Sequence, residues 1–462
     1  MDGWWIYLII NSVGLVVAAL IVGRKYIFNI RHYAAVFLGV MYITYVIRPF
    51  LSYQFGDGMA FLDLYLPGTN QQVVHDIYKL SAAFSGSIVA FAIGYRLLDR
   101  PSISSKNQQQ PVERSDYSYT IFSIFLMVFG YASFFISRSG FFMRGVGVEY
   151  TRYAGGVVYA NTTGYIEYAH YLIVAGAILY FASTGNLGST LLLSSPWVAN
   201  QIYYGYARFM YLNLAIGIAS VWLLISSSKE KSKIRFKNIL IILIPTLALL
   251  LLVTMRANRM FFQNSKNNKG ISDLVQRTYS QHIDQVLGDF SGFEGTWFVV
   301  HYANNTDHLY GAGIFYNYFI LPIPRLLWNT KPLKAEFTWG VLLDSSNLWA
   351  SKWRRGLTRV TDFIWYNTAV KGSIGYAIEE WDWAGIGLNF ILTGLFFGWM
   401  EKRYVTSAQT PVTVATYAAT YGLISMQGRN SLFDYLLIYM LIFYIPYGVI
   451  GKILRKVYIQ RK

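Results

Sequence analysis

The residues best suited to chemistry in this chain are arginines at the ends of long apolar segments. Arg208 lies in a short turn between two such segments, and Arg429 lies in another turn, directly before the last segment. A charge at membrane depth is costly, so one that is kept there usually has a function. The guanidinium group can bind phosphate through two parallel hydrogen bonds. Both positions therefore predict anion binding. For either arginine alone, contact with lipid headgroups is the alternative, as is an ion pair between Arg429 and Asp434.

Arginine also predominates among the other positive residues that lie outside the five basic clusters described below. These residues are Arg48, Arg138, Arg144, Arg152, Arg256, Arg259, Arg277, Arg325, Arg354, Arg355 and Arg359. Membrane insertion does not require this excess of arginine. We therefore expect one side of the molecule to bind an anion.

A second set of candidates could accept a proton. Glu294 lies near Phe293 and Trp297, which could exclude water from its carboxylate, and His301 follows seven residues later. Carboxylates and imidazoles are common bases for an acceptor hydroxyl. From the residues alone, a carboxylate on a loop surface is the alternative for Glu294, and an interfacial histidine is the alternative for His301.

Further carboxylates could take the same role. Glu379, Glu380 and Asp382 lie at the start of a later apolar segment. Asp57 and Asp63 lie in the first outer segment, where many-span glycosyltransferases that use lipid-linked sugars often carry a catalytic aspartate. This position supports an alternative function, although ordinary acidic loop residues would look the same.

The sequence predicts neither a metal site nor a bound cofactor. His301 and His308 are seven residues apart, a continuous helix between them is doubtful, and no His-Glu-x-x-His pattern occurs. Cysteine is absent, which excludes disulfides, cysteine-ligated metals and a cysteine nucleophile. No phosphate-loop or other nucleotide fingerprint is present.

Composition defines the scaffold that must position these residues. Of 462 residues, 54% are apolar and 13% are charged, whereas soluble domains have about 25% charged residues. These values exclude a soluble multidomain protein and a disordered one, and they indicate a single polytopic membrane domain, 1–462. The net charge of +16 is explained by basic cytoplasmic loops rather than by nucleic-acid binding.

Apolar stretches of about 20 residues, enough to cross a bilayer, recur along the chain. We predict an all-α fold of about eleven transmembrane helices near 4–23, 32–53, 77–98, 118–137, 165–183, 188–206, 209–227, 239–256, 375–400, 410–427 and 432–451. Ser194, Ser195, Pro196, Asn200 and Gln201 leave open a break in the sixth span.

The basic residues predict the orientation. Lys and Arg cluster at 24–31, 96–114, 229–237, 402–403 and 452–462. The positive-inside rule then places the N-terminus outside and the C-terminus in the cytoplasm. One large outer loop, 257–374, exceeds the length of an ordinary connection and is expected to be functional. Within it, 271–301 has helical spacing with a break near Gly292, and 309–328 suggests a re-entrant or interfacial segment.

Five segments resemble one family in the same order along the chain. Ile323-Pro-Arg-Leu-Leu-Trp-Asn-Thr-Lys-Pro332 resembles the Pro-Arg-x-Leu-Trp-x-x-Lys-Pro stretch of Wzy-type polymerases of O-antigen, common antigen and capsule. The segment from Gly375 to Gly387 is similar to that family's Gly-x-x-x-Glu region, and Ser291-Gly-Phe-Glu-Gly-Thr-Trp to its aromatic-Glu patch. Arg208 and Arg429 occupy similar turn positions, and Gly140-Phe-Phe-Met-Arg144 resembles the second outer loop. The similarity extends from about residue 120 onward.

The resemblance implies a bacterial inner-membrane enzyme that joins undecaprenyl-diphosphate-linked oligosaccharide units at the periplasmic face. It also implies a chain-length-regulating co-polymerase as a partner. A diphosphate leaving group would explain the outer arginines, which could replace a metal in stabilising that group. We therefore expect Arg208 and Arg429, then Arg144 and Arg325, to bind the diphosphate.

Glu294 is then the first candidate for the base and His301 the second. Three alternatives remain open. They are an O-antigen ligase, another glycosyltransferase that uses lipid-linked sugars, and a flippase for the same lipid-linked sugar.

Overall fold

We describe the protein from a computed structural model. The described residues are 2–55, 70–98, 117–138, 150–153, 156–159, 168–204, 208–226, 292–302, 308–323, 328 and 371–461. Side chains at some helix ends and in the two strands are not described, among them those of Arg138, Arg152 and Arg208.

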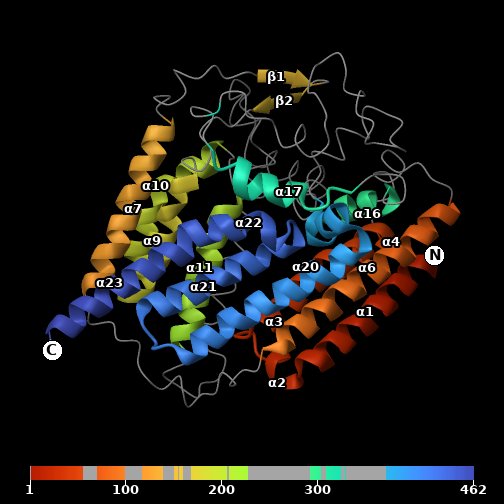
Figure 1. The fold of residues 1–462 in the computed structure, drawn as a ribbon, viewed down its shortest axis with the longest axis horizontal. Coiled ribbons are helices and arrows are strands. Elements are labelled where there is room, and N and C mark those ends of the chain that lie inside the picture. Colours follow the sequence, from red (N-terminus) through yellow and green to blue (C-terminus); the bar gives the residue numbers. More distant parts are fainter. Residues whose placement is uncertain are drawn as a thin grey trace, which may run out of the picture.

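The described chain is almost entirely helical (Figure 1). The elements before residue 160 are α1 (Asp2–Val22), α2 (Arg24–Ile27), α3 (Tyr33–Tyr42), the π-helical turn η1 (Ile43–Ile47), α4 (Arg48–Phe55), α6 (Asn70–Leu97), α7 (Tyr117–Arg138), β1 (Tyr150–Tyr153) and β2 (Gly156–Tyr159). The elements from there to residue 320 are η3 (Ala169–Tyr171), α9 (Leu172–Thr184), α10 (Leu187–Tyr204), α11 (Arg208–Ser226), α16 (Gly292–Tyr302), α17 (Ala312–Phe315) and η5 (Tyr316–Ile320). The C-terminal elements are α20 (Gly372–Thr406), α21 (Pro411–Ser425), η6 (Met426–Gly428), α22 (Leu432–Tyr439), η7 (Met440–Tyr444) and α23 (Ile445–Arg461).

Six helical segments are long and apolar enough to cross a membrane, which supports the prediction of a polytopic membrane protein. They span Gly3–Val22, Tyr33–Leu51, Val74–Leu97, Tyr117–Phe135, Gly372–Thr406 and Leu432–Ile453. Ala169–Thr184 and Leu212–Ile225 are shorter apolar helices. Ten of the eleven predicted spans fall on helices, and 239–256 lies outside the described residues. The sixth predicted span is one continuous helix, α10, with Pro196 inside it.

The fold departs from a purely helical chain at one place, in the predicted second outer loop. There β1 pairs antiparallel with β2, with Tyr150 opposite Tyr159 and Tyr153 opposite Gly156. Tyr and Val favour strands because their side chains suit the pleated backbone. The prediction of an all-α fold is therefore confirmed except for this two-stranded hairpin.

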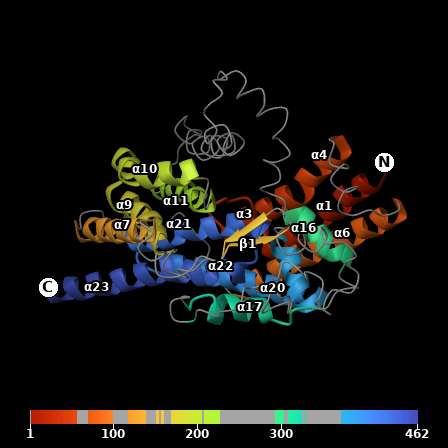
Figure 2. The same cartoon turned by 90° about the horizontal axis from the view of Figure 1, so that it is seen from above.

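Two groups of helices build the bundle (Figures 1 and 2). The first contains α1, α3, α6 and α20, and the second contains α7, α9, α10, α11 and α21. Glycines allow α6 and α20 to cross closely, because a Cβ at Gly94 would lie 2.1 Å from the carbonyl oxygen of Ile391, and one at Gly394 would lie 2.2 Å from that of Phe91. Small residues have this role at many membrane helix crossings.

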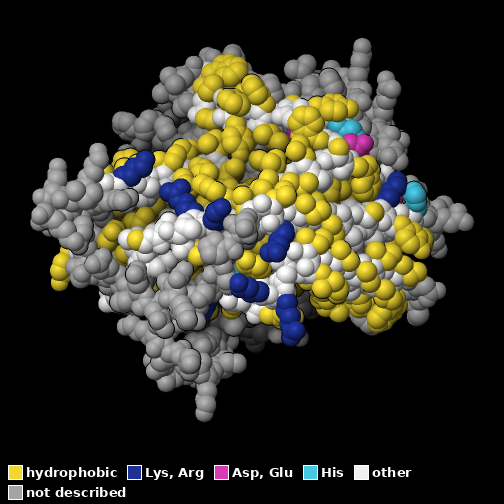
Figure 3. Space-filling model, turned by 60° about the horizontal axis from the view of Figure 1, so that its bottom comes forward, with side chains coloured by type: hydrophobic (Ala, Val, Ile, Leu, Met, Phe, Trp, Pro, Cys, Tyr) yellow, Lys and Arg dark blue, Asp and Glu magenta, His cyan; other side chains and the backbone are white. Residues whose placement is uncertain are grey.

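The buried carboxylate of Glu401 contacts residues near the ends of several helices at one end of the bundle. Glu401 accepts hydrogen bonds from Tyr95 (2.6 Å) and the backbone N–H of Tyr33 (3.2 Å), and lies 2.7 Å from His32 Nδ1. These contacts bring the basic residues around positions 24–31, 96 and 402–403 to the same end. Figure 3 shows Lys and Arg side chains as a band across this face, bordered by hydrophobic surface. We call this the basic end.

Candidate functional site

The helix α16 lies at the end of the bundle opposite the basic end, beside the N-terminal part of α1 (Figure 1). Its apolar residues recur at helical spacing, and Phe293, Trp297 and Val300 are at most 1% exposed. Trp4 of α1 stacks on Tyr53 at 4.8 Å and meets Trp297 edge-on at 5.7 Å. This aromatic packing holds α16 in place, so its polar side chains have fixed partners.

Glu294 is buried, as its aromatic neighbours in the sequence suggested. Its side chain is 7% exposed, and that of Arg48 is 11% exposed. Arg48 Nη1 donates to Oε2 at 2.7 Å, and the Tyr53 hydroxyl donates to Oε1 at 3.4 Å. Both carboxylate oxygens of Glu294 therefore accept hydrogen bonds from α4.

The local backbone of α4 explains how Arg48 reaches this position. The π-helical turn η1 ends directly before Arg48, and Pro49 follows it. Proline has no N–H to donate to the carbonyl of Tyr45, four residues earlier. The hydroxyl of Tyr7 donates to that oxygen at 2.5 Å. A π-turn is an irregularity often found at functional sites.

His301 has a carboxylate partner that the sequence reasoning missed. Its Nδ1 lies 2.6 Å from Oδ2 of Asp76, on α6, and the Trp297 indole N–H donates to the same oxygen at 3.2 Å. An ionised carboxylate only accepts hydrogen bonds, so this contact orients the ring with Nδ1 as the donor toward Asp76. Asp76 lies directly before a predicted span, where it resembles an ordinary polar flank. In the structure α6 begins earlier, at Asn70, so Asp76 lies inside the helix and is buried.

Another buried ion pair lies at the start of α20, beside α16. Thr296 donates to the carbonyl oxygen of Lys371 at 2.7 Å. The ammonium group of Lys371 pairs with Glu379, and both side chains are buried. The two charges are separated by only eight residues, and each is stabilised by the other because buried charges require a partner.

Three glycines bring Arg429 to the start of α16. A Cβ at Gly292 would lie 1.9 Å from the carbonyl oxygen of Gly428 and 3.1 Å from the Cα of Gly372. A Cβ at Gly428 would lie 2.7 Å from the hydroxyl of Thr44, one turn before Arg48. We call the meeting point of Gly292, Gly372 and Gly428 the glycine junction. It places the backbone of Arg429 next to that of α16.

Arg429 is partly exposed and forms no ion pair with any described residue. Asp434, the alternative partner, has other contacts. It caps α22 by accepting from the backbone N–H of Ser431, and it accepts from Asn317 at 2.8 Å. Tyr376 and Tyr435 lie within electrostatic range of Arg429. The geometry therefore favours a role for Arg429 other than the ion pair with Asp434.

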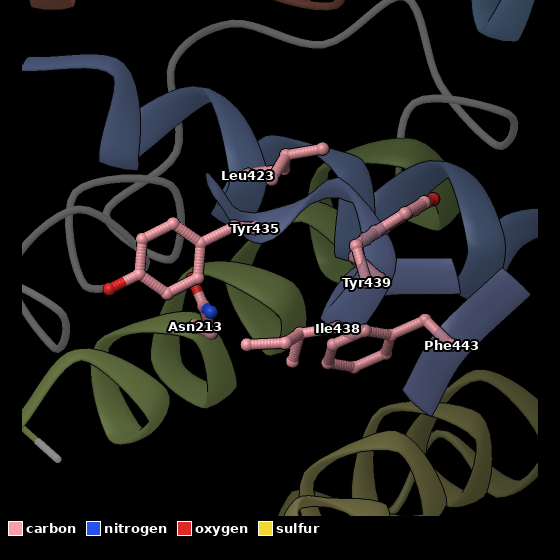
Figure 4. Close-up of a pocket in the computed structure, with 7 residues that line it drawn as sticks. Asn213, Leu423, Tyr435, Ile438, Tyr439 and Phe443 are labelled. Carbon is pink, nitrogen blue, oxygen red and sulfur yellow. The ribbon is translucent and has the colours of Figure 1, made fainter. Parts of the chain in front are cut away.

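Arg208 begins α11, at the same end of the bundle as Arg429. Asn213 lies five residues into α11, and its amide would be 2.5 Å from a Cβ at Gly422, which precedes Arg429 by seven residues. Asn213 and Tyr435 line the same small cavity of about 10 Å³, together with Leu423 (Figure 4). The contact between Asn213 and Gly422 holds the first turns of α11 against the last turn of α21.

The other predicted diphosphate ligands and two of the alternative acids lie outside the described residues. They are Arg144, Arg325, Asp57 and Asp63. The remaining carboxylates have structural partners. The backbone of α20 is broken at Trp381 and Asp382, where φ of Asp382 is 56°. This break follows directly after Glu379 and Glu380.

The segment from His308 to Gly311 lies beside this break and donates hydrogen bonds to α20. Leu309 N–H donates to the carbonyl of Glu379 at 2.9 Å, and Gly311 N–H donates to the carboxylate of Glu380 at 3.0 Å. Asp382 is half exposed and lies 3.6 Å from His308 Nε2. His308 Nδ1 lies 3.0 Å from the carbonyl oxygen of Ile378, so this histidine belongs to the surroundings of α20.

Comparisons of the chain with protein-family models, with characterised proteins and with solved structures found no match. Two ion pairs, Arg48–Glu294 and Lys371–Glu379, and the hydrogen-bonded pair Asp76–His301 lie at or beside α16, and Arg429 adjoins it. Among the described residues, no group of three His, Asp or Glu side chains is arranged to hold a metal ion.

Proposed function

We propose that this protein polymerises undecaprenyl-diphosphate-linked oligosaccharide units at the periplasmic face of the bacterial inner membrane. In this reaction the acceptor hydroxyl attacks the anomeric carbon of the growing chain. The bond from that carbon to the diphosphate breaks, undecaprenyl diphosphate leaves, and a protein base takes the hydroxyl proton. The observation that supports this proposal best is the buried charge cluster around α16 with Arg429 directly beside it.

The proposed orientation puts this cluster on the outer side. The basic end faces the cytoplasm under the positive-inside rule, and α16 lies at the opposite end. We retain the eleven predicted spans with the N-terminus outside and the C-terminus inside. The donor and acceptor would then meet the site from the periplasmic leaflet.

Arg429 and Arg208 would bind the diphosphate. They lie at the same end of the bundle, on elements held together by the contact of Asn213 with Gly422. Fixed positive groups that face a departing anion stabilise the transition state strongly because they need no reorganisation during the reaction. Arg144 and Arg325 remain the second candidates.

Of the two candidate bases, the geometry favours His301. Asp76 contacts Nδ1 of His301, so Nε2 is the ring nitrogen that would accept the hydroxyl proton, as in sites where a carboxylate orients a catalytic histidine. Both oxygens of Glu294 already accept hydrogen bonds from Arg48 and Tyr53. Glu294 stays a candidate, and in this account its ion pair also positions α16.

An apolar cavity between α9, α22 and η7 suits a lipid substrate. It has a volume of about 150 Å³ and is lined by Leu172, Ile438, Leu441 and Ile442, with Tyr168 at its polar side. Ile438 follows Arg429 by nine residues along the same segment. An isoprenoid chain attached to a diphosphate at Arg429 would find apolar surface here.

Analysis of the lipid A-linked glycans in a strain that lacks the gene would test this function. We expect a single repeat unit on otherwise intact lipid A, because ligation continues without polymerisation. Complete loss of repeat units from lipid A, with polymer retained on undecaprenyl diphosphate, would indicate a ligase. Accumulation of lipid-linked units in the cytoplasmic leaflet would indicate a flippase.

A further inference from the structure

A cavity at the basic end lies far from the site around α16. It is enclosed by the C-terminal half of α20 together with α21, η7 and α23, and has a volume of about 360 Å³. The lining residues recur at helical spacing on each wall. Arg403 and Ser407 come from α20, Thr413 and Thr416 from α21, and Tyr444 and Lys452 from the last two elements.

The polar side of this cavity carries positive charge without a matching carboxylate. Arg403 and Lys452 both line it, and no acidic residue does so among the described residues. Neither cation forms an ion pair within the described part of the chain. Two uncompensated cations with several hydroxyl groups between them match the chemistry of a phosphate group.

Aromatic rings hold Arg403 at the cavity. Its guanidinium donates to the hydroxyl of Tyr444 and lies over that ring at 5.1 Å and over the Trp399 ring at 5.8 Å. Trp399 is 38% exposed. Exposed Trp and Tyr beside basic residues are typical of the headgroup level of a bilayer.

The other side of the cavity is apolar. Met400, Val412 and Tyr447 line it, and a Cβ at Gly448 would meet no atom within 4 Å. The adjoining surface of α23 is also apolar, since Ile445, Val449 and Ile453 are 43 to 50% exposed. A ligand with a phosphate and attached acyl chains fits both sides, whereas free phosphate would use only the polar one.

We propose that this cavity binds the phosphate headgroup of an anionic phospholipid in the cytoplasmic leaflet, with Arg403 and Lys452 as its cationic ligands. Basic pockets between membrane helices on this side are known to bind such headgroups. The lipid would join α20, α21 and α23 at the end opposite the site. This proposal rests on the orientation given above and does not depend on the polymerase activity.

The experiment uses the full-length protein in nanodiscs that contain phosphatidylglycerol and phosphatidylcholine in equal amounts. Native mass spectrometry after detergent extraction counts the lipids of each kind that stay bound. A second measurement follows the melting temperature as the fraction of phosphatidylglycerol rises, because a ligand of the folded state stabilises it. Inorganic phosphate is added in a parallel series.

We expect retained phosphatidylglycerol to exceed retained phosphatidylcholine. Arg403→Gln and Lys452→Gln should each weaken retention about fivefold. Gly448→Leu should also reduce retention, because Gly448 lines the cavity and a Cβ there meets no atom within 4 Å. Gly387→Leu is the matched control, since a Cβ at Gly387 also meets no atom within 4 Å but lies away from the cavity.

Two outcomes would overturn the proposal. Equal retention of both lipids, or unchanged retention in all three cavity variants, would show that this cavity does not select an anionic lipid. Displacement of phosphatidylglycerol by millimolar inorganic phosphate, with stabilisation by phosphate alone, would identify a site for free phosphate. Loss of polymerase activity has no bearing on either result.

Discussion

Arg48 and Glu294 lie 246 residues apart in the chain, yet their side chains form a nearly buried ion pair with 2.7 Å between Nη1 and Oε2. The pair joins the N-terminal helices to α16, which comes from the predicted large outer loop. Glu294 and His301 are two turns apart on this one helix. The pair therefore sets the position of both candidate bases relative to Arg429.

Loss of Arg48 should destabilise the protein. Arg48→Ala leaves the buried carboxylate of Glu294 without its cation, and breaking a buried pair in this way costs about 3–5 kcal/mol. We expect a lower melting temperature in detergent and less protein in the membrane. The double variant Arg48→Met with Glu294→Leu should recover part of this loss. If Arg48→Ala melts like the wild type, the pair contributes little to the position of α16.

The Asp76–His301 pair predicts which group is the base. His301→Ala should lower turnover by about 10²–10⁴-fold while donor binding is kept, since this is the usual contribution of a positioned base. Asp76→Asn should lower turnover as well, because an amide NH2 that faces Nδ1 would favour the other tautomer of His301. Turnover and donor affinity are measured separately with purified protein.

His75→Ala is the matched control for these variants, because His75 is adjacent to Asp76 and exposed. It should polymerise normally. Glu294→Gln tests the rival assignment. If Glu294→Gln loses turnover at unchanged donor affinity and His301→Ala polymerises at the wild-type rate, Glu294 is the base and His301 is not.

A positive charge at position 429 should not support polymerisation unless it is carried by the forked guanidinium group. Arg429→Ala should abolish polymer while the protein stays in the membrane, and Arg429→Lys should rescue poorly. Loss of a preorganised contact to the leaving group corresponds to about 10²–10³-fold in turnover. The same substitutions at Arg208 should behave alike. Arg96→Ala, an exposed arginine at the basic end, serves as the control. Full activity of Arg429→Lys would indicate only a general positive potential.

Hydropathy predicted the positions of the apolar helices, six of which are long enough to cross a membrane, because a spanning helix needs about 20 mainly apolar residues. The break in α20 and the hairpin at 150–159 could not be predicted in this way, since both depend on local backbone contacts. Among site residues, Glu294 and His301 were predicted, and both lie on α16. Their partners Arg48 and Asp76 could not be assigned, because a single sequence does not show which distant charges meet.

The glycine junction should be intolerant of any side chain. Gly292→Ala would place a methyl group 1.9 Å from the carbonyl oxygen of Gly428, and backbone atoms cannot move aside as side chains do. Overpacking typically costs about 1–3 kcal/mol, so we expect lower stability and reduced turnover. Gly387→Ala has open space around it and should be silent. A Gly292→Ala protein with wild-type melting and activity would show that these backbones do not meet so closely.

The orientation can be tested by single-cysteine labelling, because the chain has no cysteine of its own. A membrane-impermeant thiol reagent applied to intact spheroplasts should label Asn268→Cys and spare Ser232→Cys. After permeabilisation, both should react. The reverse pattern in intact spheroplasts would place the α16 end in the cytoplasm and exclude a periplasmic reaction.

The most direct measurement of the central claim is polymer synthesis by the purified protein. Proteoliposomes would receive only undecaprenyl-diphosphate-linked repeat units, and the products would be separated by size. We predict a ladder of lipid-linked glycans, with one undecaprenyl diphosphate released for every new linkage and no need for a nucleotide sugar. Absence of any product longer than one repeat from folded protein, with transfer appearing only when lipid A core is added, would contradict the account and identify a ligase.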